Sequence, residues 1–308
     1  MNLRLRECLA GVAVVITCIA PTVRAQGPMT ATDPAVGVLV VAHGSDAAWN
    51  APVDSLAAHV QRHGVIRGPV SVAFLMGDEA PKHRFQDAVA DLVKRGARRV
   101  VVVPVLVSSY SGHYDQIRYL AGKTDSLDSD MMMMLHMSGI ERPNSVPITV
   151  TPGLDDSPEL ARVLTARAEA LAPDAADRSH RALFLFGHGP NSAEDYAAWM
   201  KNLRVVADSV RAATGFANVA VELVRDDAPA EVRGEAVKRA REIVTLQHAA
   251  TNKDVVIVPI LVSTGAIAET KLPGDLAGLP AVYSPAPLLP DANLVQWVER
   301  RVLQAPPR

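Results

Sequence analysis

Two stretches of the chain, VVVPVLVSSYSGH (residues 101–113) and VVIVPILVSTGAIA (residues 255–268), are close copies of one another. Each begins as a run of Val and Ile, which is typical of a strand buried on both faces of a parallel sheet. Each then leaves that strand through a Leu-Val-Ser segment. A chain that repeats both a buried strand and its exit loop contains two similar units. The copies differ at one chemically important position, where His113 of the first is Ala268 in the second.

Three further pairs of segments repeat in the same order. They are VLVVAHG (38–44) with ALFLFGHG (182–189), FLMGDEAP (74–81) with ELVRDDAP (222–229), and VPITVTP (146–152) with LPAVYSP (279–285). Repetition of this kind indicates an internal duplication. Apolar residues recur at helical spacing between the repeated strands, so each unit alternates strands with helices. We therefore predict an α/β protein of two tandem Rossmann-like (flavodoxin-like) parallel-sheet lobes, residues 36–171 and 180–304.

The N-terminal 25 residues have the pattern of a secretory signal peptide. Arg4 and Arg6 precede an apolar run over residues 9–20, and Val23-Arg24-Ala25 provides a small-x-small cleavage site. We expect cleavage after Ala25 and a periplasmic or secreted protein with no membrane span once the signal is removed. An uncleaved anchor is the alternative. Both cysteines, Cys8 and Cys18, lie in this segment, so the mature chain would contain no thiol and no disulfide.

Composition excludes some classes of partner. The chain has 308 residues, 21% of them charged, and a formal net charge of −2. No basic run indicates nucleic acid or an anionic membrane surface as a partner. The length suits two lobes, and the sequence leaves a homodimer open.

Two histidines are predicted to meet at one edge of the first sheet. His43 directly follows the first strand, and His113 lies in the loop that leaves the third. In a flavodoxin-like order, ligands bind between the carboxyl ends of these two strands. Two imidazoles delivered there can share one divalent metal ion, although a His in a Gly loop can also be a hydrogen-bonded structural residue. His188 repeats His43, but with Ala268 the second unit has at most one ligand from these loops.

The segments GVLVVAHGSDAAWN (37–50) and GARRVVVVPVLVSSYSGHYDQI (96–117) resemble the sirohydrochlorin cobaltochelatase/ferrochelatase family. Members of that family insert Co²⁺ or Fe²⁺ into a tetrapyrrole. The resemblance implies a class II chelatase fold with a tetrapyrrole in the cleft between two lobes, and His43 and His113 as metal ligands and proton acceptors. The divalent metal is then a substrate, with Ni²⁺ and Zn²⁺ as alternatives to Co²⁺ and Fe²⁺. The residues expected to line the cleft are Ser45, Ser108, Ser109, Tyr110 and His188.

The sequence departs from this family at several points. Relatives usually carry Glu at the end of the second strand, where this chain has Met76. Asp78 and Glu79 follow closely, and we expect Glu79 to be the substitute proton acceptor; the alternative is that both are solvated turn residues. Asp46 stands where relatives often have Arg. Export also conflicts with a biosynthetic role in the cytoplasm, which favours the alternative of an exported, non-catalytic metal- or haem-binding carrier or sensor that uses the same cleft.

The first unit contains a Met-rich insertion, SDMMMMLHMSG (129–139), which includes Met131–Met134 and His136. Thioether and imidazole groups together bind soft metal ions. Methionines also fill irregular apolar gaps, and consecutive side chains on a helix diverge around its axis. Packing therefore accounts for the segment as well as metal binding does, and a lid over the cleft is the functional role we expect for it.

Overall fold

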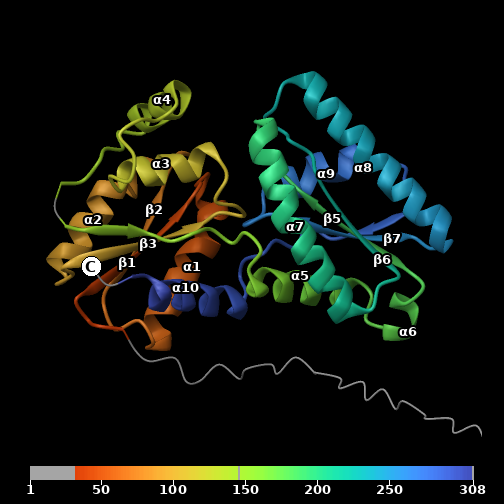
Figure 1. Ribbon diagram of the computed structural model, residues 1–308, viewed down its shortest axis with the longest axis horizontal. Helices are drawn as coiled ribbons and strands as arrows, with labels where there is room; N and C mark the ends of the chain where they lie inside the picture. The colour runs from red at the N-terminus through yellow and green to blue at the C-terminus, as the bar shows by residue number, and fades with distance from the viewer. Residues whose placement is uncertain (1–31, 145, 307–308) are drawn as a thin grey trace, which may run out of the picture.

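The computed structural model describes residues 32–144 and 146–306, so the predicted signal peptide lies outside the described residues. Figure 1 shows two α/β lobes side by side, joined through helices at their junction. Among the described residues, no helix is both long enough and apolar enough to cross a membrane.

The first lobe is built around a parallel sheet of order β2-β1-β3-β4. The elements of the first repeat are β1 (Val36–Ala42), α1 (Ala47–His63), β2 (Val70–Phe74), the short helix η1 (Ala80–Lys82), α2 (Phe85–Lys94), β3 (Arg99–Val105), α3 (Gly112–Leu120), α4 (Ser129–Met137), β4 (Ile148–Val150) and α5 (Pro158–Leu171). The central strand β1 pairs with β2 on one side, from Val38 opposite Val70, and with β3 on the other, from Val36 opposite Arg99.

The second lobe repeats this plan with the order β6-β5-β7-β8. The elements of the second repeat are α6 (Ala175–Arg178), β5 (Ala182–Gly187), α7 (Ala193–Thr214), β6 (Asn218–Leu223), α8 (Ala230–Thr251), β7 (Val255–Ile260), the π-helical turn η2 (Ile267–Lys271), α9 (Leu272–Asp275), β8 (Ala281–Tyr283) and α10 (Ala292–Gln304). All strand pairs are parallel in both sheets. The predicted fold class, two duplicated flavodoxin-like lobes, is confirmed.

The central strands are buried because helices cover both faces of each sheet. Every residue of β1, β5 and β7 is buried, which is why these strands are continuous apolar runs. In the first lobe, α2 and α3 lie above the sheet in Figure 1, and α1 and α10 lie below it. The carboxyl ends of the central strands therefore carry loops that are held between two layers of helices.

The last helices of the two repeats are exchanged. Helix α5 ends the first repeat but packs against α7 and β7 of the second, whereas α10 ends the second repeat and packs against α1 and β3 of the first. The two helices also touch each other: Arg300 of α10 donates hydrogen bonds to both carboxylate oxygens of the buried Glu159 of α5, the Nε–Oε1 distance being 3.0 Å. The repeats are sequential in the chain, yet each lobe is completed by a helix of the other.

One hydrophobic core runs through both lobes as a consequence. It joins β1 and β3 of the first lobe to α7 and β7 of the second through the buried faces of α5 and α10. A second, smaller core lies within the second lobe, between β5, β7 and α8. The two lobes are therefore held as one unit, which fixes the loops that face each other at the junction.

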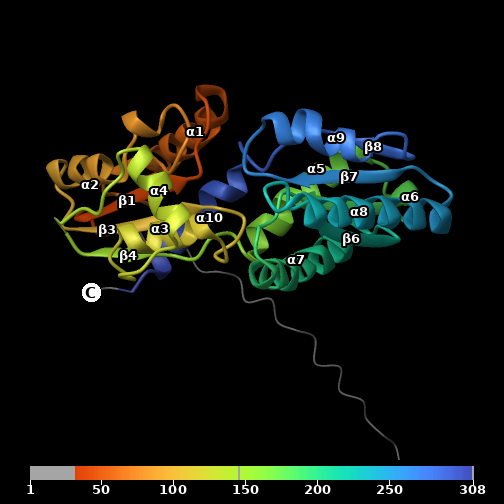
Figure 2. The ribbon, with the colours of Figure 1, turned by 90° about the horizontal axis from the view of Figure 1, so that it is seen from above.

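The Met-rich insertion forms α4, which packs on α3 of its own lobe. Asp128 caps its first turn by accepting the N–H groups of Asp130 and Met131. Figure 1 shows α4 above α3 at the top of the first lobe, and in the view from above in Figure 2 α4 lies over the lobe, next to α3. The Met131 side chain lies against Gly112, where an added Cβ would lie 2.6 Å from Sδ, whereas Met133 and Met137 are exposed. This packing is of the kind expected of methionines that fill an irregular gap.

Candidate metal site at the junction of the lobes

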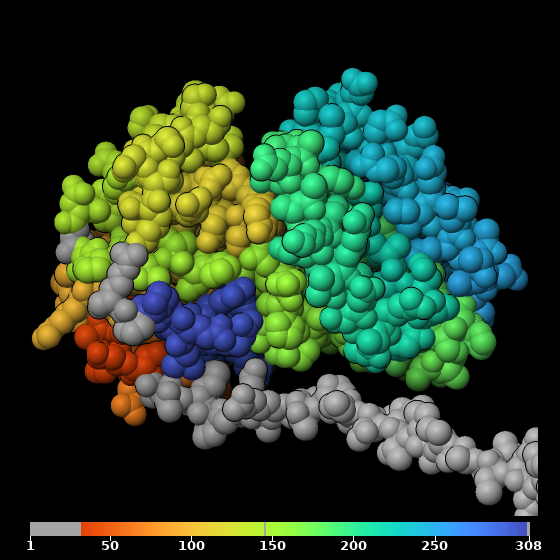
Figure 3. Space-filling view, in the orientation of Figure 1, coloured from red at the N-terminus to blue at the C-terminus, as the bar shows by residue number. Residues whose placement is uncertain are grey.

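Loops from the strand ends of both lobes meet at the junction. Ser263, after β7, donates a hydrogen bond from Oγ to the carbonyl of Trp49 in the first lobe, at 2.8 Å. The indole N–H of Trp199 on α7 donates to the carbonyl of Tyr110, which follows β3. Figure 3 shows a groove between the two lobes, bordered by α3 and α4 on one side and by α7 and α8 on the other. The carboxyl ends of both sheets thus face the same junction.

His43 is positioned by the turn that follows β1. Gly44 adopts φ +87°, and a side chain at this position would come 2.4 Å from the carbonyl oxygen of Met76, so the turn requires glycine. The ring Nδ1 of His43 lies 2.6 Å from the Gly44 carbonyl. A carbonyl can only accept, so Nδ1 carries the proton and Nε2 keeps its lone pair.

His113 lies in the first turn of α3 and faces His43. Its Nδ1 is 2.9 Å from Oε1 of Gln116, whose Nε2 donates to the carbonyl of Met131 at 2.8 Å. This buried amide fixes the ring so that Nε2 is again the free nitrogen. The ring centroids of His43 and His113 are 4.6 Å apart, and the ring planes are nearly perpendicular. The two predicted histidines therefore lie side by side, each with an unprotonated Nε2.

Electrostatics keep both rings neutral. Burial, helped by the neighbouring His113, lowers the pKa of His43 from 6.5 to about 4. Burial also lowers the pKa of His113, against the hydrogen bond that its Nδ1–H donates to Gln116 and against the charge of Asp227. Neutral imidazole is the form that binds metal, so at pH 7 the pair needs no deprotonation before it takes up an ion. Two protein ligands make an open site, from which an ion can be passed on.

The low pKa of His43 predicts acid sensitivity of the fold. Between pH 6.5 and pH 4 the unfolded chain binds a proton that the folded chain excludes, so the free energy of unfolding falls as the pH falls through this window. The loss for this group is about 3 kcal/mol. In urea denaturation, the free energy of unfolding should fall between pH 7 and pH 4 for both proteins. The fall should be smaller for His43→Gln than for wild type, by about 3 kcal/mol. The exposed His59 on α1 provides the control, and a His43→Gln variant that follows the wild-type curve would contradict burial of the imidazole.

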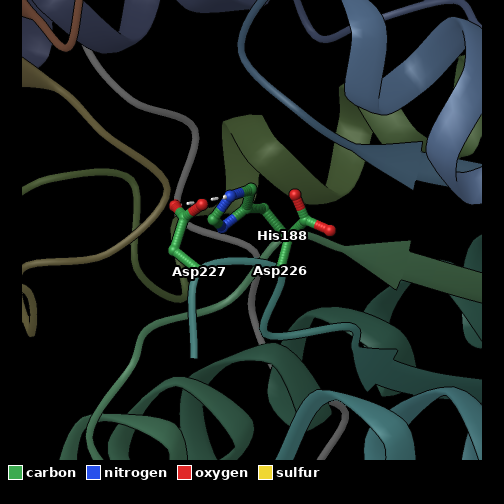
Figure 4. Close-up of side chains that lie close together, drawn as sticks. All are labelled: His188, Asp226 and Asp227. Carbon is green, nitrogen blue, oxygen red and sulfur yellow. Dashed lines mark ion pairs between the residues drawn. The ribbon is translucent and has the colours of Figure 1, made fainter. Parts of the chain in front are cut away.

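The second lobe presents a different set of groups at the equivalent place. His188 follows β5 as His43 follows β1, and its Nδ1 lies 2.7 Å from the carbonyl of Gly189. Its Nε2 lies 3.2 Å from Oδ2 of Asp227. Figure 4 shows the ring between the carboxylates of Asp227 and Asp226, and one ligand atom from each of the three residues falls within 4.8 Å of the others. Arg233 and Lys271 both pair with Asp226.

Position 268 contributes no chemical group to the second lobe. Ala268 is buried in η2, and its carbonyl accepts a hydrogen bond from the Tyr283 hydroxyl. The repeat of His113 has therefore become part of the hydrophobic core, and within residues 32–144 and 146–306 only the first lobe holds a pair of imidazoles at its strand ends.

The other predicted site residues have varied surroundings. Glu79 forms an ion pair with Lys82 on η1, with Nζ–Oε distances of 2.9 and 3.1 Å. Ser109 is held by Asp155 through both its backbone N–H and its hydroxyl, at 2.8 and 2.7 Å. Ser108 is buried, and its hydroxyl accepts the N–H of Tyr110, whose side chain is exposed. These groups shape the β3 exit loop.

The β1 exit loop is shaped by polar groups in a similar way. The backbone N–H of Ser45 donates to Oδ1 of Asn50, at 2.9 Å. Asp46 accepts the N–H of Trp49 at 2.8 Å and so caps the first turn of α1. The carboxylate that replaces the Arg of relatives therefore has a structural role at the helix terminus.

Sequence reasoning missed two functional candidates. Asp227 is the repeat of Glu79. The aligned segments FLMGDEAP and ELVRDDAP show that the second copy has a carboxylate at the same position. Gln116 lies three residues after His113 on the same helix, a spacing that brings side chains together. The first contacts His188 and the second His113.

One protein-family model matches the part of the chain that contains this site. The CbiX family model matches residues 37–171, the segment that contains His43 and His113. Over these residues, the N-terminal lobe is similar to the CbiX family. No curated protein sequence matches the chain.

Solved structures show that both lobes follow the chelatase fold. SirB from Bacillus subtilis, solved with Fe³⁺, has a TM-score of 0.60 and 17% identity over 87% of this chain and 94% of its own. DR2241 from Deinococcus radiodurans, a multi-domain protein with structural similarity to chelatases, has a TM-score of 0.56 and 19% identity over 87% of this chain and 55% of its own. CbiX, the terminal enzyme of siroheme biosynthesis in denitrifying bacteria, has a TM-score of 0.50 and 14% identity over 86% of this chain and 97% of its own. The lobe that matches the CbiX family model is thus one half of a two-lobed chelatase-like fold.

Proposed function

We propose that the protein is a chelatase that inserts a divalent metal ion, Co²⁺ or Fe²⁺, into sirohydrochlorin or a related tetrapyrrole. The observation that carries the proposal is the pair of neutral imidazoles, His43 and His113, with centroids 4.6 Å apart at the junction of the lobes. The match of the lobe that holds the pair to the CbiX family model, and the likeness of the fold to SirB and CbiX, point to the same chemistry. Nickel and zinc ions fit the same donors.

The residues meet the requirements of metal insertion. The ion must first bind weakly, and two imidazole ligands leave most of its coordination sphere to water. The macrocycle then displaces that water as its nitrogens bind. Two pyrrole N–H bonds must break in the process, so a base is needed close to the macrocycle. Ser45 and Tyr110 lie in the loops of the groove, where they would contact the tetrapyrrole.

Multiple turnovers test the proposal. Mature protein would be mixed with sirohydrochlorin and excess Co²⁺, and in parallel with Fe²⁺ under anaerobic conditions, while the absorbance of the metallated product is followed. A catalyst forms many equivalents of product per chain, faster than the uncatalysed reaction. Product formation no faster than the uncatalysed rate would refute the proposal.

One observation favours a second function, an exported metal or haem carrier. The position where relatives have a carboxylate is Met76, whose N–H donates to the carbonyl of His43, so a group here lies beside the pair. Glu79, the substitute expected from the sequence, is bound to Lys82. A carrier would take up one equivalent of metal or haem per chain and then stop, which the same experiment distinguishes from catalysis.

We also propose that the chain is exported, on the signal-peptide pattern of residues 1–25. The expected mature protein begins at Gln26 and is recovered outside the cytoplasm. Intact mass of the protein purified from fractionated cells of its native host tests this. A full-length chain in the cytoplasmic fraction would contradict it.

A further inference from the structure

The second lobe presents an acid–base pair to the junction, opposite the two imidazoles of the first. His188 and His43 occupy equivalent positions after the central strands β5 and β1, and each ring is oriented by the carbonyl of the glycine that follows it. Burial lowers the pKa of both His43 and His113, and the charge of Asp227 acts in the opposite direction on both rings. His188 and Asp227 therefore act on the same space as the predicted metal ligands, from the other lobe.

The surroundings of His188 do not favour a metal ion. Asp226 could complete a set of three ligands with His188 and Asp227, but its carboxylate already pairs with Arg233 and Lys271. An ion at this place would have to compete with two cations for a buried carboxylate. Without Asp226, only His188 and Asp227 of this group of three remain as donors.

The geometry of His188 and Asp227 suits the binding of a proton between the two side chains. Nδ1 of His188 lies against a carbonyl and so carries a hydrogen, which leaves Nε2 of the neutral ring as an acceptor. Nε2 faces Oδ2 of Asp227 at 3.2 Å, so two acceptors oppose each other. One proton placed between them turns this repulsive contact into a charge-assisted hydrogen bond.

We propose that His188 and Asp227 together accept the protons that the tetrapyrrole releases when it takes the metal ion from His43 and His113. This assignment deepens the proposed function and rests on it. During insertion two pyrrole N–H bonds break, and their electron pairs become the donor pairs of two new metal–nitrogen bonds. The two protons leave one after the other through the His188–Asp227 pair to water, with no oxidation or reduction.

The exposure of the two side chains supports a path to solvent. The side chain of His188 is 25% exposed, and that of Asp227 is 65% exposed. A proton taken up on the cleft side can therefore be returned to water through the carboxylate. In the first lobe, the repeats of these residues do not form such a pair, because Glu79 is bound to Lys82.

The pair should impose a pH dependence on insertion. The groups that face it are His43 and His113 from the first lobe, Asp226 from its own loop, Arg233 from α8, and Lys271 from η2. Burial acts to lower the pKa of His188, but the hydrogen bond to Asp227 and the Gly189 carbonyl outweigh it, so the pKa is raised. Because only the unprotonated pair can accept a proton, the rate should rise with pH through this raised pKa.

Asp227→Asn provides the sharpest test. An amide in place of the carboxylate no longer stabilises the imidazolium, so the rising limb of the pH–rate profile should move to lower pH. The maximum rate of Co²⁺ insertion into sirohydrochlorin should fall about 10²-fold. Binding of Co²⁺ without tetrapyrrole, followed by calorimetry, should be unchanged because the metal is held by the other lobe. Asp227→Glu should recover part of the rate.

The control residues lie at the amino ends of the strands of the second sheet, away from His188 and Asp227 at the carboxyl ends. His180 precedes β5 and Asp254 precedes β7, both are exposed, and His180→Ala and Asp254→Asn should retain the wild-type rate and profile. An unchanged rate and profile in folded Asp227→Asn, checked by its melting temperature, would overturn the proton-acceptor role alone. A loss of Co²⁺ binding as large as that of His43→Ala would overturn it in favour of a metal ligand. No turnover by the wild type would overturn both this role and the proposed function.

Discussion

Replacing either His43 or His113 with alanine is expected to lower the rate of Co²⁺ insertion into sirohydrochlorin by about 10²–10⁴-fold, the range of groups that act on reacting atoms. Each ring supplies one of two free nitrogens at the site, and a single remaining imidazole cannot hold the ion beside the macrocycle. The double variant should be little slower than either single variant, since the two rings act as one unit. Initial rates with saturating tetrapyrrole measure this.

The matched control is His59→Ala, which removes an exposed imidazole from α1. It should leave the rate at the wild-type value. Equal rates in wild type and His113→Ala would show that the pair does not take part, and multiplicative losses in the double variant would show that the two rings act separately.

Trp297→Ala should produce the largest loss of stability in the chain. Trp297 lies on α10, is fully buried, and belongs to the core that joins the two lobes. Removing a buried indole costs about 3–5 kcal/mol through lost transfer free energy and the cavity left behind. Because α10 packs against the sheet of the first lobe, the substitution should destabilise the lobe that holds the histidine pair, although the residue is far away in the sequence.

Denaturant unfolding measures this effect. Gln296→Ala, an exposed neighbour on the same helix, should change the free energy of unfolding by less than about 0.5 kcal/mol. A single transition for both lobes is also expected from the shared core. A Trp297→Ala loss below about 1 kcal/mol, or separate unfolding of the two lobes, would contradict the exchanged packing of α5 and α10.

The fold could be predicted from the sequence because the same alternation of buried strands and helices occurs in both repeats. Buried strands such as VVVVPV and VVIVPI have no alternative to a sheet that is covered on both faces, and the strand-exit positions of His43 and His113 then follow from the topology. The structure places these two rings together. Metal binding by them stays a prediction.

The exchange of α5 and α10 could not be predicted from a single sequence. The spacing of apolar residues in each helix shows that one face is buried, but it does not say which sheet covers that face. The contacts of α5 with β7 and of α10 with β3 decide the matter, and no local signal connects these elements. The sequence boundaries of the repeats and the spatial boundaries of the lobes differ for this reason.

The contact of Asp227 with His188 could not be predicted from the repeat alone. Its repeat, Glu79, has the same place in the alignment and a longer side chain, yet it contacts Lys82 three residues later. Asp227 has no such lysine nearby in sequence, and it contacts His188. A repeat can therefore predict which positions are equivalent, but the local partners determine which copy presents its carboxylate to the site.

A crystal soaked in Co²⁺ tests the central claim most directly, since anomalous scattering at the cobalt edge locates the ion without assumptions. The account predicts one peak at about 2.0–2.2 Å from Nε2 of both His43 and His113, with water completing the coordination. A peak held by His188 and the carboxylates of Asp226 and Asp227, with none beside the His43–His113 pair, would contradict it.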